Sequence, residues 1–322
     1  MIPDKLRILN VEPINFSNEA RSILQSIGEL VEKEVRSRDE LINLVKDFDV
    51  LIVRLRFQID KKILKNAPRL KVIVSATTGL DHIDLDFAKS RGISILSLKG
   101  ESEFLRSIPA TAEHTWALLL SLVRKIPWAF DDVKRGHWNR DNFRGHDLEG
   151  KKLGVLGFGR IGEKVAKYAL AFNMEIGAYD PYRKEWPDYV KRFHDIENFL
   201  KWLDILTIHI PLNNDTRCFV DRRKLIQMRK GSLIINTSRG DVIDEKALVD
   251  LLKSGHIAGA ALDVVSGETT GSISHDLILY ASNNQNLIIT PHIGGATQES
   301  MWKTEVFMAK KLRKWVTKHV HQ

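Results

Sequence analysis

Short apolar runs alternate with amphipathic stretches along the first hundred residues. Apolar, β-branched runs predict strands at 6–9, 50–53, 70–75 and 93–98, and apolar residues at helical spacing predict helices at 18–27, 39–48 and 61–65. Strands that are apolar at every position are typical of a parallel sheet that helices cover on both faces. This part of the chain therefore predicts a parallel α/β layer.

The pattern changes after residue 100 and resumes at residue 150. Residues 110–125 favour a helix that is too apolar to lie on a surface unpaired, so they predict a buried connecting helix or a subunit contact. Further strands are predicted at 152–156, 175–179, 205–209, 232–236, 258–264 and 287–290, with a final helix over about 297–320. Two such alternations indicate an α/β protein with two doubly wound parallel-sheet domains, of Rossmann or flavodoxin-like type.

Composition adds little beyond a soluble class. The chain has 322 residues, which is long for one core, with 43% hydrophobic and 28% charged residues. The single cysteine, Cys218, excludes an internal disulfide and is expected to be a buried small apolar residue. No apolar leader and no run of about 18 apolar residues is present, so we expect a cytoplasmic protein without a membrane partner.

The net charge of +8 could attract anionic small molecules or nucleic acid. The basic excess is diffuse, and its densest cluster, at 310–318, lies on the predicted terminal helix, where a solvated face is the usual interpretation. No zinc-finger spacing, basic zipper or RNA-binding signature is present. We therefore expect neither a nucleic-acid partner nor a metal site.

The strongest local signal is the strand at 152–156 running into Gly157-x-Gly159-x-x-Gly162. In a dinucleotide site the first glycine permits a tight turn, the second lets the backbone approach a pyrophosphate, and the third lets the next helix pack closely. That helix, predicted over 161–172, would direct its N-terminal N–H groups at the phosphates. A plain glycine turn is the alternative for the motif on its own.

An acidic residue, Asp180, follows the strand at 175–179. A carboxylate there can accept hydrogen bonds from the ribose hydroxyls of NAD and would repel the extra phosphate of NADP. We therefore favour NAD, although Arg183 just beyond could tolerate that phosphate. The other interpretation of Asp180 is a solvated turn residue before Pro181.

Three further polar candidates each follow a predicted strand, where open α/β sheets bind ligands. Arg239, before a glycine, can hold a carboxylate through two parallel hydrogen bonds. Glu268 lies in the acidic loop that begins at Asp263, and His292 is suited to exchanging a proton with a substrate oxygen. Each alone could be structural. Together, after three strands, they predict a catalytic site.

These residues, in this order, resemble the D-isomer-specific 2-hydroxyacid dehydrogenase family, and phosphoglycerate dehydrogenases most among its members. The likeness extends to residues 77–84, 111–115, 209–216, 240–245 and 261–263. The resemblance implies an NAD-dependent oxidoreductase that transfers a hydride between NAD(H) and C2 of a D-2-hydroxy acid or 2-oxo acid. So many matches are specific for the family and much less so for the substrate.

The resemblance also implies catalytic roles. Arg239 would bind the substrate carboxylate and polarise its carbonyl, and His292 would be the general acid in reduction and the base in oxidation. Glu268 would hydrogen-bond His292, orienting it and favouring the imidazolium. Formate dehydrogenases resemble this pattern but have an amide at that position, so the carboxylate of Glu268 indicates that a proton is moved.

Binding roles follow by position. The implied cofactor-binding residues are Gly157, Gly159, Arg160, Ile161, Gly162, Asp180, His209, Pro211, Thr216, Thr237 and Asp263, the last at the nicotinamide. The implied substrate-binding groups are the backbone N–H groups of Thr77, Thr78 and Gly79, with Arg54 for a distal anionic group. Arg56 is a weaker candidate, and a solvated loop arginine is the alternative for both. Where phosphoglycerate enzymes have a serine after the arginine, this chain has Leu55.

The resemblance further implies a substrate-binding domain formed by 1–102 and 294–322, an NAD-binding Rossmann domain at 103–293, and an active-site cleft between them that closes on substrate. A homodimer formed through the helix at 110–125 is expected. Two segments depart from the family, the polar loop after Glu268 and the long crossover at 99–109.

Two questions stay open at this point. An NAD-sensing binding protein of the corepressor type, on the same fold, is the alternative function, and the physiological direction of an enzyme is not decided. His114, in the 111–115 match, is interpreted as a satisfied core or interface histidine.

Overall fold

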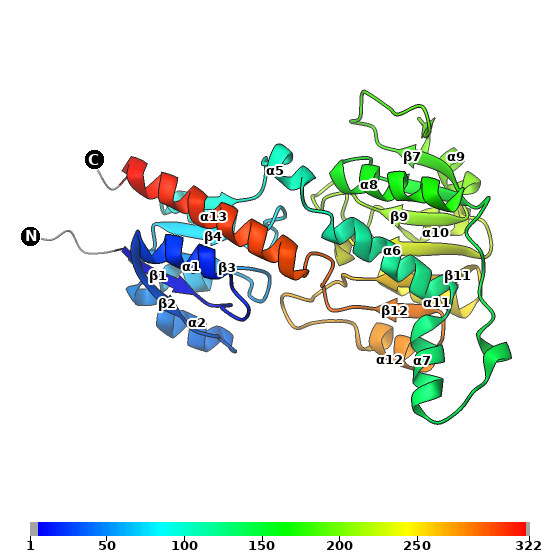
Figure 1. Cartoon of the computed structure of the whole chain (residues 1–322), viewed down its shortest axis with the longest axis horizontal. Helices are drawn as coiled ribbons and strands as arrows, with labels where there is room; N and C mark the ends of the chain where they lie inside the picture. Colours follow the sequence, from blue (N-terminus) through cyan, green and yellow to red (C-terminus); the bar gives the residue numbers. More distant parts are fainter. Residues whose placement is uncertain (1–5, 320–322) are drawn as a thin grey trace, which may run out of the picture. The chain divides into compact units, whose positions relative to one another are not determined.

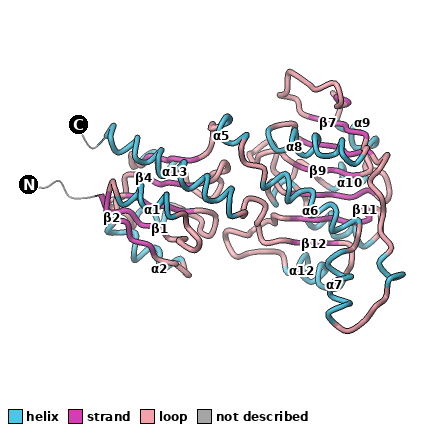
Figure 2. Tube along the Cα trace, in the orientation of Figure 1, coloured by secondary structure: helices cyan, strands magenta, loops and turns pink. Residues whose placement is uncertain are grey.

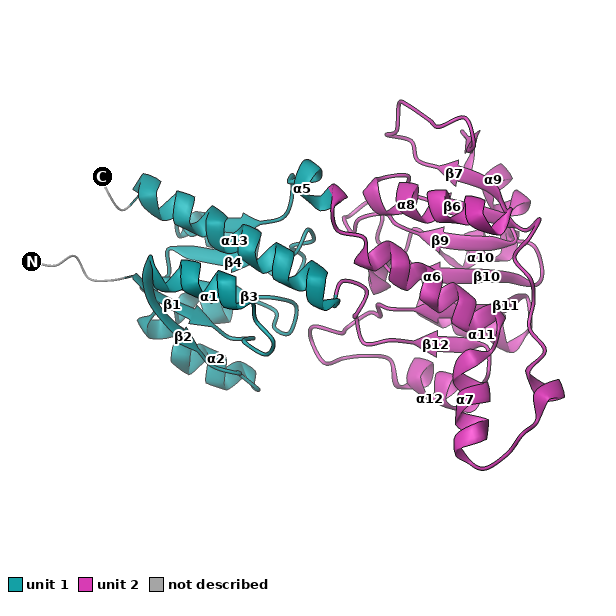
Figure 3. Cartoon of the chain, in the orientation of Figure 1, with its two compact units in different colours: residues 1–105, 296–322 teal, residues 106–295 magenta. Residues whose placement is uncertain are grey.

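The computed structural model of the chain describes residues 6–319, so Val320, the expected end of the last helix, lies outside the described residues. The chain forms two compact units, shown in Figure 3. Unit 1 comprises Met1–Leu105 and Ala296–Gln322, and unit 2 comprises Arg106–Gly295. The domain boundaries expected from the sequence lie between 102 and 103 and between 293 and 294.

Unit 1 is built on a parallel five-stranded sheet in the order β2-β1-β3-β4-β5. Its strands are β1 Leu6–Asn10, β2 Gly28–Glu32, β3 Val50–Val53, β4 Val72–Ser75 and β5 Ser94–Ser97. Its helices are α1 Asn18–Gln25, α2 Arg38–Leu44, α3 Lys61–Lys65, α4 Leu85–Ser90, α5 Ser102–Arg106, which ends at the unit boundary, and α13 Gln298–His319. This strand order is the flavodoxin-like form of a doubly wound sheet.

The chain's last helix completes unit 1. Helix α13 packs on α1 and on strands β4 and β5, as Figure 1 shows. Its buried face includes Met308, Ala309 and Leu312, and burial of a methionine or leucine side chain contributes about 1.5–3 kcal/mol. The C-terminal segment is therefore an integral part of the N-terminal unit.

Unit 2 is built on a parallel seven-stranded sheet in the order β12-β11-β10-β9-β6-β7-β8. Its strands are β6 Lys152–Leu156, β7 Glu175–Tyr179, β8 Lys191–Phe193, β9 Ile205–Ile208, β10 Ser232–Asn236, β11 Ile257–Leu262 and β12 Leu287–Ile289. Its helices are α6 Ala110–Val123, α7 Ile126–Lys134, α8 Arg160–Ala169, α9 Ile196–Trp202, α10 Arg222–Gln227, α11 Glu245–Lys253 and α12 His275–Asn283. The strand order reverses between β6 and β9, as in dinucleotide-binding folds, and such a switch point is where ligands bind.

Helix α6 is the buried helix that the sequence predicts. It packs on α8, β10 and β11, and Figure 2 also shows α6 and α8 running across one face of the sheet. Its buried residues include Trp116, Leu118, Leu119 and Leu122. The predicted helix ends earlier than expected because Lys125 adopts a left-handed conformation, with φ of 55°, and starts α7.

Two local expectations need correction. Cys218 is exposed, so the prediction of a buried residue is wrong. It lies in a turn with φ of 50°, where its N–H donates to the carbonyl of Asp241 at 2.7 Å and its side chain points away from the core. Strand β2 went unpredicted because it is a half-exposed edge strand, Gly-Glu-Leu-Val-Glu, with no continuous apolar run.

In the part of the chain that the structure describes, no helix combines the length and the apolar character needed to cross a bilayer.

Candidate active site

The glycine-rich turn joins β6 to α8. Gly157 has φ of +87°, which favours glycine, and a Cβ on Gly162 would lie 2.2 Å from the Gly157 carbonyl oxygen. Gly159 caps the N-terminus of α8, and nothing lies within 4 Å of where its Cβ would be. The turn therefore leaves open space beside the backbone at the positive end of a ten-residue helix, which fits a dinucleotide pyrophosphate.

Asp180 is held at the end of β7, beside this turn. Its Oδ2 accepts a hydrogen bond from Phe158 N at 2.9 Å, and its Oδ1 accepts one from Tyr182 N at 2.9 Å. Arg183, the residue that could tolerate NADP, is engaged elsewhere. Its guanidinium pairs with Glu163 at 3.2 Å and donates to the Glu185 carbonyl at 2.6 Å. A fixed carboxylate and an arginine that is already paired thus follow β7.

The segment after β9 packs on the same turn. A Cβ on Gly157 would lie 2.9 Å from the carbonyl of His209, so the two backbones are in close contact. Both ring nitrogens of His209 are buried and bond to no residue that the structure describes. Burial lowers the pKa of His209 to about 3, so this ring is neutral at neutral pH.

Other predicted cofactor residues are held by local contacts. The Thr216 hydroxyl donates to the Pro211 carbonyl at 2.6 Å and accepts from Asn213 N at 2.8 Å, which closes a short turn. Arg160 donates to the Ile108 carbonyl at 3.1 Å, and burial lowers its pKa. Ile161 follows it in the first turn of α8.

His292 and Glu268 form a close pair. Their atoms Nδ1 and Oε1 are 2.6 Å apart, and each side chain is 22% exposed. Because a carboxylate only accepts hydrogen bonds, Nδ1 carries the proton of this contact. The other ring nitrogen, Nε2, is then the atom that can exchange a proton with a ligand.

Arg239 lies in a turn that Asn236 shapes. The Asn236 side chain donates to the Arg239 carbonyl at 2.9 Å and accepts from Ser238 N at 3.0 Å. A Cβ on Gly240 would lie 2.1 Å from the Val265 carbonyl carbon, so this turn packs directly on the loop that carries Glu268. Strands β10, β11 and β12 are parallel neighbours, and Arg239, Glu268 and His292 follow their three ends in that order.

Asp263, the expected nicotinamide contact, is also bonded to residues of unit 2. It is 1% exposed and accepts four hydrogen bonds, from His114 Nε2 at 3.1 Å, Thr290 Oγ1 at 2.6 Å, Ile293 N at 2.8 Å and Gly294 N at 2.7 Å. Burial acts to raise the pKa of Asp263, but these hydrogen bonds outweigh it and hold the pKa below its ordinary value. Its carboxylate therefore binds the turn around His292.

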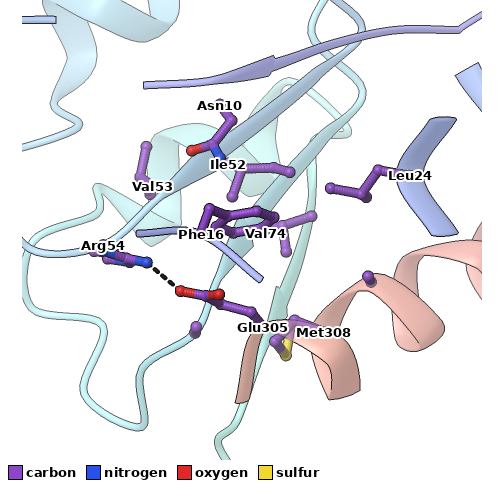
Figure 4. A pocket seen from close by; sticks show the side chains of 11 residues that line it. Asn10, Phe16, Leu24, Ile52, Val53, Arg54, Val74, Glu305 and Met308 are labelled. Carbon is purple, nitrogen blue, oxygen red and sulfur yellow. Dashed lines mark hydrogen bonds and ion pairs between the residues drawn. The ribbon is translucent and has the colours of Figure 1, made fainter. Parts of the chain in front are cut away.

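The sequence candidates in unit 1 are engaged within that unit. Arg54 forms an ion pair with Glu305 of α13, shown in Figure 4, and Glu305 also accepts from Ser17 N at 2.7 Å. Arg56 donates to the Val35 carbonyl at 3.0 Å. Apolar side chains surround the Arg54–Glu305 pair, including Phe16.

The loop that follows β4 is fixed by a chain of hydrogen bonds. The Thr77 hydroxyl donates to the Gly79 carbonyl at 2.8 Å and lies 2.8 Å from the hydroxyl of Ser75. Ser75 in turn lies 3.2 Å from Nε2 of the buried His82. Thr78 lies between the two bonded residues, so the predicted substrate-binding turn has a defined shape.

Comparison with known proteins identifies the chain's relatives. Residues 116–294 match the D-isomer specific 2-hydroxyacid dehydrogenase, NAD binding domain. The chain is 37% identical over 301 residues to a hydroxypyruvate reductase of Thermotoga maritima, covering 93% of this chain and 95% of that protein. It is also 37% identical over 312 residues to D-3-phosphoglycerate dehydrogenase of Methanocaldococcus jannaschii, covering 96% of this chain but only 57% of that protein's length.

A solved structure agrees with the sequence relatives. D-Lactate dehydrogenase of Aquifex aeolicus, crystallised with NAD and lactic acid, superposes with a TM-score of 0.81 at 28% identity and covers 98% of this chain and 96% of its own. The profile match covers more than half of this chain and includes the glycine turn, Asp180, Arg239, Glu268 and His292. The chain therefore belongs to the D-isomer specific 2-hydroxyacid dehydrogenase family, and its second unit contains that family's NAD binding domain.

Proposed function

We propose that the protein catalyses hydride transfer between NAD(H) and C2 of a D-2-hydroxy acid or its 2-oxo acid. The observation that carries this proposal is the His292–Glu268 pair, 2.6 Å apart, on the loops next to the turn of Arg239. A partly exposed acid–base pair beside an arginine matches what the reduction of a 2-oxo acid needs, a proton donor and a cation.

The residues divide the work as follows. The Arg239 guanidinium binds the substrate carboxylate and the carbonyl oxygen, which stabilises negative charge as it builds on that oxygen. His292 gives its Nε2 proton to the oxygen in reduction and takes it back in oxidation. Glu268 keeps Nδ1 protonated and the ring oriented. Bound NAD(H) supplies or accepts the hydride at C2.

The cofactor residues favour NAD over NADP. The fixed Asp180 carboxylate can accept hydrogen bonds from ribose hydroxyls, and it would repel a phosphate at the same place. Arg183, paired with Glu163, would have to leave that partner to bind such a phosphate. His209, Pro211, Thr216 and Thr237 are the remaining proposed contacts, and the Thr77–Gly79 turn is the proposed second substrate-binding element.

The substrate is proposed to be a small 2-oxo acid. Relatives named for hydroxypyruvate and for phosphoglycerate are equally similar in sequence. Arg54, the predicted partner of a distal anionic group, is ion-paired with the buried Glu305. This pairing favours a substrate without a phosphate.

A homodimer through α7 is also proposed. This helix buries none of its residues and exposes Ile126, Phe130 and Val133 by 51%, 62% and 50%, with Trp138 exposed by 85% just beyond it. Residues spaced by four and three lie on one helix face, and such an apolar patch is typical of a protein interface. Helix α6, the contact expected from sequence, is instead packed inside unit 2. We retain the cytoplasm as the proposed location.

The test is NADH oxidation by the purified protein against 2-oxo acids with and without a phosphate ester. Turnover of at least one of them would support the dehydrogenase. NADH binding without turnover of any would contradict it and favour an NAD-sensing binding protein, for which the acid–base pair has no use.

A further inference from the structure

Helix α6 presents a polar stripe to the candidate active site. Thr111, His114 and Thr115 are spaced by three and four residues, so they share one helix face, while the apolar residues of α6 lie in the core of unit 2. The stripe lies beside two turns. A Cβ on Gly294 would lie 3.5 Å from the His114 ring and 3.6 Å from the Thr111 methyl group. The hydroxyls of Thr115 and Thr237 are 2.8 Å apart.

We propose that α6 is a positioning element for catalysis, in which His114 acts through Asp263 on the turn of His292, and Thr115 acts through Thr237 on the turn of Arg239. The proposal rests on the roles assigned to His292 and Arg239 above. It gives a function to His114, which the sequence alone suggests is a core or interface histidine.

The His292 turn needs such support because its backbone is strained. His292 has φ of 54°, a left-handed conformation that costs a non-glycine residue about 1–3 kcal/mol. The His292 N–H donates to the carbonyl of Asp263 at 2.8 Å, and the Asp263 carboxylate accepts from the next two backbone N–H groups. Asp263 therefore holds the backbone of this turn through hydrogen bonds from His292 and from the two residues that follow it.

The side chains of His114 and Thr290 hold the Asp263 carboxylate in place. The Thr290 hydroxyl donates to Asp263 Oδ1, which leaves its oxygen able to accept from His114 Nε2, 3.1 Å away. Nε2 also lies 3.1 Å from Asp263 Oδ1, so one N–H of His114 serves both oxygens. A buried carboxylate that loses such a donor is undersatisfied and shifts to recover it. The His292 turn would shift with it.

Thr115 makes the second contact of α6 with the site, the second arm of the proposal. Its hydroxyl donates to the Thr111 carbonyl at 2.8 Å, so its oxygen accepts from the hydroxyl of Thr237. Thr237 is buried and lies two residues before Arg239. One rigid helix thus fixes the proton donor and the carboxylate-binding arginine, which come from strands β12 and β10.

The experiment uses matched variants of the full chain. His114→Leu removes the donor, whereas His114→Gln keeps an N–H of similar reach, and Thr115→Val and Thr115→Ser form the same contrast for the second arm. A displacement of about 1 Å can cost roughly 100-fold in rate. We expect His114→Leu to lower kcat at least about 10-fold with NADH affinity unchanged, and His114→Gln to recover most of it. Thr115→Val should instead raise the KM of the 2-oxo acid several-fold, and Thr115→Ser should not.

This split between kcat and KM is what a general loss of stability would not produce. A kcat of folded His114→Leu within twofold of the wild-type value would overturn the proposal. An equal loss of kcat in His114→Leu and His114→Gln would also overturn it. If His114→Leu does not fold, Thr290→Val against Thr290→Ser tests the same arm by the same criteria.

A second readout needs no turnover, so it separates this proposal from the proposed function. The Nδ1 proton of His292, bonded to Glu268, is assigned in the NMR spectrum by its loss in His292→Asn. We expect the chemical shift of this proton to change in His114→Leu and to match that of wild type in His114→Gln. An unchanged chemical shift in His114→Leu would contradict the proposal, even if no substrate is turned over.

Discussion

Unit 1 and unit 2 are both doubly wound parallel sheets, but the polar side chains at their strand ends are arranged in different ways. In unit 2 the strand ends carry the open glycine turn, the fixed Asp180 and the partly exposed His292–Glu268 pair. In unit 1 the arginine after β3 is paired with Glu305, which is 3% exposed. Both members of the His292–Glu268 pair are thus partly exposed, whereas the carboxylate of the Arg54–Glu305 pair is buried.

The difference shows that architecture alone does not locate chemistry. A doubly wound sheet offers strand ends as places for ligands, and the local partners decide whether a side chain there is free to act. Single substitutions at the charged and polar positions of each unit test this contrast.

Glu268→Gln should lower kcat by roughly 1,000-fold, because the ring of His292 loses the carboxylate that fixes its proton on Nδ1. NADH affinity should stay within about twofold. Steady-state kinetics and NADH fluorescence titration check both, with Glu197→Gln, at a half-buried position, as the control. Loss of NADH binding to the same extent as kcat would show that the pair supports the fold instead.

Arg239→Lys should lower kcat/KM for the 2-oxo acid by roughly 100-fold, since an ammonium cannot replace the planar fork of donors. The same assay on Arg217→Lys, which alters a surface pair with Asp241, should give wild-type values. An unchanged KM and kcat in Arg239→Lys would remove Arg239 from the site.

Glu305→Gln should reduce the free energy of unfolding by about 3 kcal/mol, because Arg54 then loses the buried carboxylate of its ion pair. Urea denaturation measures this, and Glu19→Gln, which breaks an exposed pair with Lys310, should cost less than about 1 kcal/mol. Equal losses in the two variants would erase the contrast between the units. NADH affinity should be unaffected.

Asp180→Ala should narrow the preference for NADH over NADPH by roughly tenfold, through loss of the ribose hydrogen bonds and of the repulsion of phosphate. The ratio of the two dissociation constants is the measurement, with Glu185→Ala as a neighbouring control. A ratio equal to that of the wild type would place the ribose elsewhere.

A pH-dependent effect concerns the neutral His209. Its pKa is about 3 in the folded chain and about 6.5 when unfolded, so the unfolded state binds more protons between these values. Stability should therefore fall as pH drops below about 6.5, by at most about 1.4 kcal/mol per pH unit from this residue. Urea titrations at pH 7, 6 and 5 should show a shallower fall in His209→Leu. Identical slopes would contradict a buried neutral ring.

Features that depend on neighbouring residues were predictable from the sequence. The β3 strand and the glycine turn are local, because apolar runs and glycine spacing specify them. The order of Arg239, Glu268 and His292 after successive strands also follows from the chain.

Long-range contacts were not predictable in this way. His114 meets Asp263 from 149 residues away, and Arg54 meets Glu305 from 251 residues away. The family resemblance implies ligand contacts for Asp263 and Arg54, but not their partners on α6 and α13, which meet them only in the folded chain. The exposed Cys218 was missed because its orientation depends on one left-handed residue.

The most direct test of the central claim, that the chemistry lies in the available pair of unit 2, is the single-turnover rate of NADH oxidation by wild type and His292→Asn. Excess enzyme is mixed with NADH and a 2-oxo acid on which the wild type is active. We expect a rate at least about 100-fold slower in His292→Asn, at unchanged NADH affinity. Equal rates in the two proteins would contradict it.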